Sequence, residues 1–140
     1  MPRIYRIMTA DGEKPLVANT ARGLGVRIGG GPHDDVAVTA DGEIVPNTGG
    51  MSVAPSWRDL PLHRIPRRLR NAMPNATGAN LDACWRIGEG AFIYAPIAEG
   101  LMLRPDRPTH GTVEPRNLTS VENYLRDLGA TRDDWVIDES

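Results

Sequence analysis

Alternation of apolar and polar positions predicts short β-strands over most of the chain. In "RIYRIMTA", residues 3–10, one face carries Ile4, Arg6 and Met8, so this segment is expected to be the first strand. The dipeptide Asp41-Gly42 lies between β-branched apolar pieces and predicts a tight hairpin with strands near 36–39 and 43–45. Further strands are expected in "CWRIGEGAFIYAPI" and "LMLRPDRPTHGTVEP", two of which would pair with the earlier ones.

A helical period appears near the end of the chain and predicts one amphipathic helix near 119–129. Thr119 and Glu122 have the spacing of a capping box, and Gly129 is expected to end the helix. Apolar residues follow the i, i+3, i+4, i+7 spacing of one helix face: Val121, Tyr124, Leu125 and Leu128.

Prolines and glycines divide the rest into short elements. Prolines 61, 66 and 74 rule out a continuous helix in 56–74, so we expect a loop there, with one turn of helix at 67–71. Twelve prolines and fifteen glycines in 140 residues favour a mixed α+β fold, with mixed or antiparallel sheets, few helices and one domain over 1–140.

Composition argues against several functional classes. A formal net charge of −2 does not favour a surface built for nucleic acid or anionic lipid. The single cysteine, Cys84, excludes an internal disulfide framework, indicates a reducing compartment and is expected in the core beside Trp85. Neither a secretory signal nor the ~20 apolar residues of a membrane span is present, so we expect a soluble, cytoplasmic protein without a membrane partner.

Two common kinds of site are not predicted. His33, His63 and His110 are scattered and no ligand pair has metal-site spacing, so no metal centre is expected. The glycine-rich stretch 23–31 lacks the third glycine of a dinucleotide fingerprint, and no Gly-Lys-Ser/Thr follows it.

Three short segments carry the candidate chemistry. Arginine binds phosphates, glycines allow close backbone approach, and a carboxylate stabilises an oxocarbenium ion. Together these groups are suited to breaking a nicotinamide–ribose bond. The residues concerned are Arg6 in the first strand; Thr48, Gly49, Gly50 and Ser52 in "PNTGGMSVAP"; and His110, Thr112 and Glu114, which share one face of "THGTVEP".

The order of "IYRIM", "PNTGGMSV" and "THGTVEP" resembles bacterial type VI secretion effectors with an ADP-ribosyltransferase-like fold. The resemblance implies that Arg6 binds the NAD ribose phosphate, that Thr48 and Ser52 brace the nicotinamide cleft, and that Glu114 lies where the catalytic glutamate is expected. A full Ser-Thr-Ser motif is absent, and Thr112 stands where Gln or Glu usually precedes that glutamate.

The same resemblance also implies a biological role, a route of delivery and a partner protein. The domain would be a toxin that consumes NAD in a target-cell cytoplasm, delivered there without a signal peptide. It would transfer ADP-ribose to an unknown macromolecular acceptor, and a cognate immunity protein would neutralise it. Within the site, Arg6, Ser52 and Glu114 would be catalytic, while Arg6, Thr48, Gly49, Gly50, Ser52 and His110 would bind NAD.

Two other functional classes remain open. The segment 57–70 carries five arginines, and Trp57 offers a stacking surface, so a non-enzymatic module that binds nucleic acid or protein is the alternative. These arginines also fit a solvated loop whose charges pair with acidic residues. A small structural subunit is the third possibility.

Overall fold

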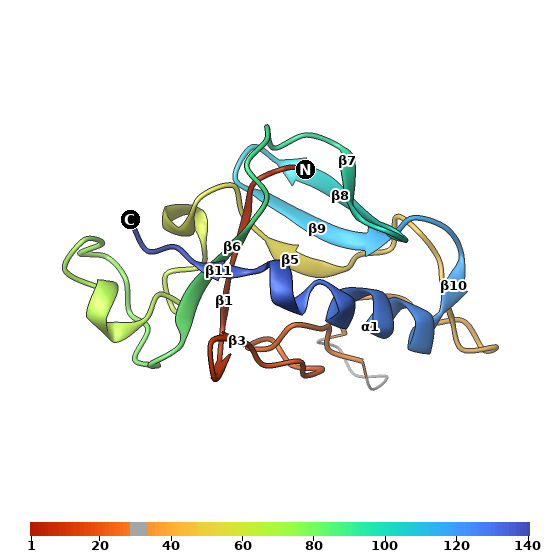
Figure 1. Ribbon diagram of the computed structural model, residues 1–140, viewed down its shortest axis with the longest axis horizontal. Helices are drawn as coiled ribbons and strands as arrows, with labels where there is room; N and C mark the ends of the chain where they lie inside the picture. The colour runs from red at the N-terminus through yellow and green to blue at the C-terminus, as the bar shows by residue number, and fades with distance from the viewer. Residues whose placement is uncertain (29–33) are drawn as a thin grey trace.

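The computed structural model describes residues 1–28 and 34–140, and its strands form two main antiparallel sheets. The smaller has the order β1 (Ile4–Met8), β6 (Ala83–Ile87), β11 (Val136–Ile137), so the first expected strand pairs with a segment about eighty residues later. Figure 1 shows this sheet beside the loops of 57–80.

The larger sheet has the order β5 (Met51–Val53), β9 (His110–Pro115), β8 (Leu101–Arg107), β7 (Ala95–Ala98). Ser52 lies opposite Thr112, which lies opposite Arg104, so these three side chains share one face. Met51 and Val53 point to the other face, which is buried. The expected pairing of two late strands with earlier ones is confirmed by β6 with β1 and β9 with β5.

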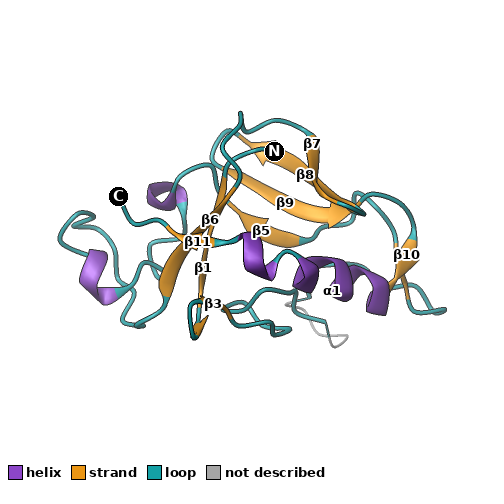
Figure 2. Cartoon of the chain, viewed as in Figure 1, coloured by secondary structure: helices purple, strands orange, loops and turns teal. Residues whose placement is uncertain are grey.

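The remaining elements are short. Those with strand geometry are β2 (Ala10–Asp11), β3 (Lys14–Pro15), β4 (Glu43–Ile44) and β10 (Thr119–Ser120). The 3₁₀ turns are η1 (Trp57–Asp59), η2 (Arg67–Leu69) and η3 (Arg132–Asp134), so the segment 56–74 is a loop with two such turns (Figure 2).

The hairpin expected at Asp41-Gly42 is present only as a turn. Gly42 has φ 78° and its N–H donates to the Thr39 carbonyl, while a single bridge joins Val38 to Ile44. β4 also pairs with β10, from the segment before the helix. The prediction of a strand at 36–39 was therefore wrong, because only one bridge and the Thr39 N–H bond to the Glu43 carbonyl join this segment to the two-residue β4.

The helix α1 (Val121–Ala130) confirms the expected stripe, with corrections at both ends. Ser120, not Thr119, is the N-cap, because its side chain accepts from the Asn123 N–H. Gly129 lies inside the helix, which ends at Ala130, and the C-cap residue Thr131 has right-handed helical geometry. Tyr124 fixes α1 to the larger sheet, since its hydroxyl donates to the Val113 carbonyl and accepts from the Met51 N–H.

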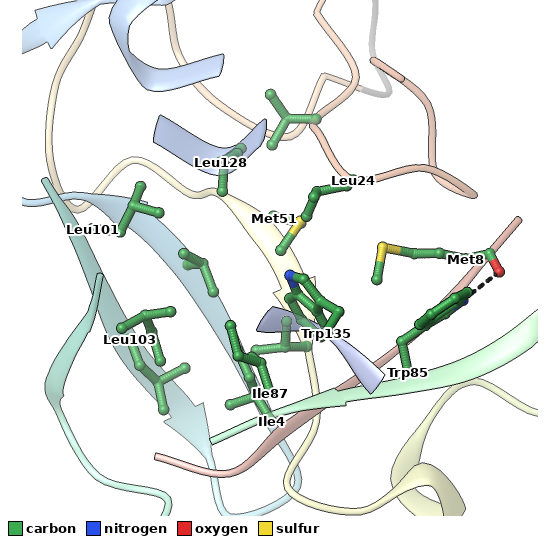
Figure 3. Packing of buried hydrophobic residues seen from close by; sticks show 14 of the residues in the cluster. Ile4, Met8, Leu24, Met51, Trp85, Ile87, Leu101, Leu103, Leu128 and Trp135 are labelled. Atoms are coloured by element: carbon green, nitrogen blue, oxygen red, sulfur yellow. Dashed lines mark hydrogen bonds between the residues drawn. The ribbon is translucent and has the colours of Figure 1, made fainter. Parts of the chain in front are cut away.

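Two hydrophobic clusters form the core, and β1 lies between them. Ile4 and Met8 belong to the larger cluster, between the sheets and α1, while Tyr5 and Ile7 belong to the smaller one. Figure 3 shows the larger cluster, in which the Trp85 Nε1–H donates to the Met8 carbonyl at 2.9 Å. All five residues of β1 are buried because each face of the strand packs against one of the two clusters.

The fold is thus mixed α+β, rich in sheet, with one C-terminal α-helix in the described residues, as expected. None of the helices in residues 1–28 and 34–140 has the length and apolar character that crossing a bilayer requires.

Candidate functional site

A cavity of about 360 Å³ opens where β1, β5 and the start of β9 meet Ala21, Arg27, Asp35 and the segment 59–64. This volume lies in the lower part of the ~300–1,000 Å³ range of small-molecule sites. Arg6, Ser52 and His110, from the three segments singled out in the sequence, all line it. The other charged or titratable residues of the wall are Arg27, Asp35, Asp59, His63 and Arg64.

Arg6 is buried and its guanidinium is held by backbone carbonyls. Nη1 donates to the Ser52 carbonyl at 2.8 Å and Nε to the Gly23 carbonyl at 3.1 Å. Nη2 reaches the carbonyls of Thr20, Ala21 and Gly25 at 3.3–3.4 Å. No carboxylate among the described residues forms a hydrogen bond or ion pair with this cation.

Burial lowers the pKa of Arg6 to about 10, with Asp35 acting in the opposite direction, so the group stays charged at neutral pH. Nη1 carries two hydrogens, and within 1–28 and 34–140 only the Ser52 carbonyl accepts from it. One N–H of a buried cation in the cavity wall is therefore left without an acceptor there.

Two more arginines, Arg27 and Arg64, line the cavity. Arg27 is neutralised by Asp35, which it contacts through Nε and Nη2, the latter at 2.9 Å. The guanidinium of Arg64 has no acceptor among the described residues, and its neighbour His63 is exposed. Arg64 is therefore the wall cation best able to take up an anion.

Ser52 and His110 lie on the same face of the larger sheet. The Ser52 side chain is exposed beside Thr112, while its carbonyl accepts from Nη1 of Arg6. His110 opens β9, and its Nδ1 lies 2.7 Å from Oδ1 of Asp106 on β8.

The structure gives the Thr48-Gly49-Gly50 turn a packing role and does not place it in the cavity wall. A Cβ on Gly49 (φ 122°) would collide with the Asp35 carbonyl, and one on Gly50 with the Val113 carbonyl. The Thr48 hydroxyl donates to the Val45 carbonyl at 2.7 Å. The glycine pair thus lets the protein's own backbones approach, and its expected contact with NAD stays a prediction.

Glu114 is 3 % exposed and is not among the residues that line the cavity. Its Oε1 accepts from the Asn47 N–H at 2.9 Å and from Arg104 Nε at 3.2 Å, and its Oε2 accepts from the Thr112 hydroxyl at 2.9 Å. The carboxylate therefore ties β9 to β8 and to the turn before β5. The catalytic role expected for it remains a prediction.

The arginine-rich segment 57–70 is less suited to nucleic acid than its sequence indicates. Trp57 is 1 % exposed and donates from Nε1 to the Ser140 carbonyl, so the stacking surface expected there is absent. Arg58 covers its ring at 4.4 Å, and Arg68 bonds Glu139 and the Asp82 carbonyl. The expectation of paired charges is thus met for Arg68.

Sequence reasoning missed Arg27, Asp35, His63 and Arg64 as residues of the site. All four lie in loops, where no period reveals a facing direction. The signals available were the five arginines of 57–70 and the position of Arg27 beside the glycines. Gly29, Gly30, Gly31 and His33, considered for phosphate and metal binding, lie outside the described residues.

Cys84 is buried on β6, as expected for a core residue. Burial, with the negative charges of Glu139 and Asp138, raises the pKa of its thiol, which disfavours the nucleophilic thiolate. In the part of the chain that the structure describes, no three His, Cys, Asp or Glu side chains are grouped to hold a metal ion.

Comparison of the sequence with models of known protein families, and with curated proteins, finds no match.

Proposed function

We propose that the chain is a toxin domain that binds NAD in this cavity and cleaves the nicotinamide–ribose bond, with ADP-ribose passing to an acceptor. The observation that carries the proposal is Arg6, a buried cation in the cavity wall to which no described carboxylate bonds. Buried charges in proteins are normally paired, and a phosphate-bearing ligand would supply the missing negative charge.

The diphosphate is proposed to bind Arg64 and the remaining Nη1 hydrogen of Arg6. Both lie in the wall of one cavity, and phosphate accepts charge-assisted hydrogen bonds from guanidinium groups. The exposed hydroxyl of Ser52, which also lines the cavity, is proposed to contact the nicotinamide ribose. The convergence of Arg6, Ser52 and His110 on this cavity supports the assignment, because nothing in their sequence spacing requires it.

In the proposed reaction the C–N bond between ribose and nicotinamide breaks, and its electron pair neutralises the pyridinium nitrogen. The resulting oxocarbenium-like carbon is attacked by an acceptor oxygen. The resemblance assigns the opposing negative charge to Glu114.

Thermal unfolding with NAD tests the binding step. A ligand that binds only the native state stabilises it, by ~2.7 kcal/mol at one hundred times its Kd. We expect NAD to raise the Tm of wild type and of Arg67→Ala, whose side chain is exposed outside the cavity, but not of Arg64→Ala. No shift in wild type at millimolar NAD overturns the proposal.

The toxin and type VI secretion parts of the proposal rest on the sequence resemblance. Expression in a bacterial cytoplasm without an immunity protein is expected to arrest growth, and Arg64→Ala to relieve the arrest at equal protein level. Full growth with abundant wild-type protein counts against a toxin. The immunity protein is proposed to act by covering the cavity.

A further inference from the structure

His110 and Asp106 form a side-chain pair at the turn end of the hairpin that joins β8 to β9. His110 Nδ1 and Asp106 Oδ1 are 2.7 Å apart, and the histidine is about one-quarter exposed. The strand pairing shifts between Pro105 and Arg107, and Arg107 then lies opposite His110. This irregularity places Asp106 beside the imidazole.

The pair fixes which ring nitrogen of the neutral imidazole is available. Burial alone would raise the pKa of Asp106, but the hydrogen bond with His110 is the largest influence that opposes burial, and the pKa is lowered overall. Asp106 is therefore an ionised acceptor, and Nδ1 carries the proton. The lone pair of the neutral ring then lies on Nε2, which has no hydrogen-bond partner among the described residues.

Both acidic and basic side chains lie around His110. Asp106 and Arg107 approach it from β8. The cavity that it lines also holds Arg6 from β1 and, from the loops, Arg27, Asp35, Asp59, His63 and Arg64. Asp35 is already bonded by Arg27, so Asp106 is the carboxylate that acts directly on the imidazole.

We propose that His110 is the general base for the acceptor in this cavity and that Asp106 is its positioning residue. As the oxygen of water or of an acceptor hydroxyl bonds to the ribose carbon, its proton passes to Nε2 of His110 and then to solvent. One C–O bond forms as the C–N bond to nicotinamide breaks, and no oxidant or reductant is needed. This inference rests on the proposed function and names the acceptor class as a hydroxyl.

Nicotinamide release by purified variants tests the pair. General-base catalysis contributes typically ~10²–10⁴-fold, so His110→Gln is expected to lower kcat by ~10² or more with KM for NAD nearly unchanged. Asp106→Asn is expected to lower kcat by ~10-fold, because the proton on Nδ1 is no longer fixed. Asp41→Asn, an exposed turn aspartate far along the chain, is the matched control and should behave as wild type.

Two further measurements distinguish a general base at His110 from a histidine that only holds the hairpin together. Wild-type turnover should fall as the pH is lowered, because a protonated imidazole cannot accept a proton, and this acid limb should vanish in His110→Gln. Nitrogen NMR of wild type should show the proton on Nδ1 of His110, and Asp106→Asn should lose that preference.

The outcomes distinguish this inference from the function on which it rests. Wild-type release of nicotinamide with equal kcat in His110→Gln overturns the base and leaves the proposed function standing. Failure of wild type to raise its Tm with NAD or to release nicotinamide overturns the proposed function, and the base with it.

Discussion

Arg6 joins β1 to two other segments through the carbonyls of Ser52, Gly23, Thr20, Ala21 and Gly25. Arg6→Ala would leave these acceptors buried without donors, at ~1–3 kcal/mol for each group that finds no water. We expect urea unfolding to show a loss of at least ~3 kcal/mol. Arg6→Lys, which keeps the charge but offers fewer donors, should lose less. An unchanged unfolding midpoint for Arg6→Ala would contradict this structural role.

Glu114 has a structural role in the fold and a predicted catalytic role, and one substitution tests both. Glu114→Gln retains the shape but removes the charge that accepts from Asn47, Thr112 and Arg104, so we expect a loss of ~1–3 kcal/mol in unfolding free energy. The sequence resemblance predicts a further fall of ~10² in nicotinamide release per folded molecule. Unaltered release, corrected for the folded fraction, would remove Glu114 from the mechanism.

At the scale of elements, the first turn of α1 depends on its cap. Ser120→Ala removes the acceptor for the Asn123 N–H and should cost ~0.5–2 kcal/mol. Thr119→Ala, one residue earlier, has no such bond to lose and is the matched control. Thermal unfolding of the two variants measures the difference, and a larger loss for Thr119→Ala would restore the cap expected from the sequence.

The loop 57–70 is expected to bind nucleic acid weakly or not at all. Trp57 is buried, and Arg58, Arg64 and Arg68 are turned to the Trp57 ring, the cavity and Glu139 respectively. Fluorescence anisotropy with single- and double-stranded DNA at 50 mM salt should show no binding. Binding that weakens by ~10³ between 50 and 200 mM salt would instead favour the nucleic-acid module.

The sequence predicts an element well when residues within that element determine its structure, and poorly when contacts with distant segments determine it. Periodicity in β1, β9 and α1 is local, and these elements lie where expected. Thr119 and Ser120 are adjacent and both carry a hydroxyl that can cap a helix, so the sequence does not determine which of them caps α1. β4 pairs with β10 because of packing that no short pattern contains.

The same limit applies to the candidate site. Arg6, Ser52 and His110 meet in one cavity, but the alternation that puts Glu114 on the His110 face does not say how far along the strand the cavity extends. Arg64 and Asp35 reach the wall from loops, whose side-chain directions depend on tertiary contacts. The order of the motifs predicted Arg6 and two further segments that line the cavity, but it did not predict Arg64, whose guanidinium has no acceptor among the described residues.

At the scale of the whole molecule, ion pairs between distant segments make stability depend on pH. Arg22 and Thr9 bond Asp82 strongly enough to outweigh burial and lower its pKa, while Ser140 and Arg86 lower that of Asp138. A carboxyl whose pKa is lower in the folded state stabilises above its unfolded value near ~4, and this contribution is lost as pH falls through the folded value.

We therefore expect Tm to be nearly constant from pH 7 to about pH 5 and to fall below about pH 4. Asp82→Asn should lower Tm at pH 7 and flatten this acid decline, whereas Asp41→Asn should leave the profile unchanged. Calorimetry across the pH series makes the measurement. A profile for Asp82→Asn parallel to that of wild type would show that the pair with Arg22 does not contribute.

The position of β1 between two clusters also bears on how the molecule opens. Its amides pair with β6 on one edge, and Tyr5 exchanges two backbone bonds with Ala54 on the other. If one hydrophobic cluster opened, the other would still pack against one face of β1. We therefore expect the β1 amides to exchange with solvent deuterium only when both clusters unfold. The slowest-exchanging protons of the domain should accordingly lie at 4–8, and their exchange should report global unfolding, whereas amides of the 57–80 loops exchange through local fluctuations.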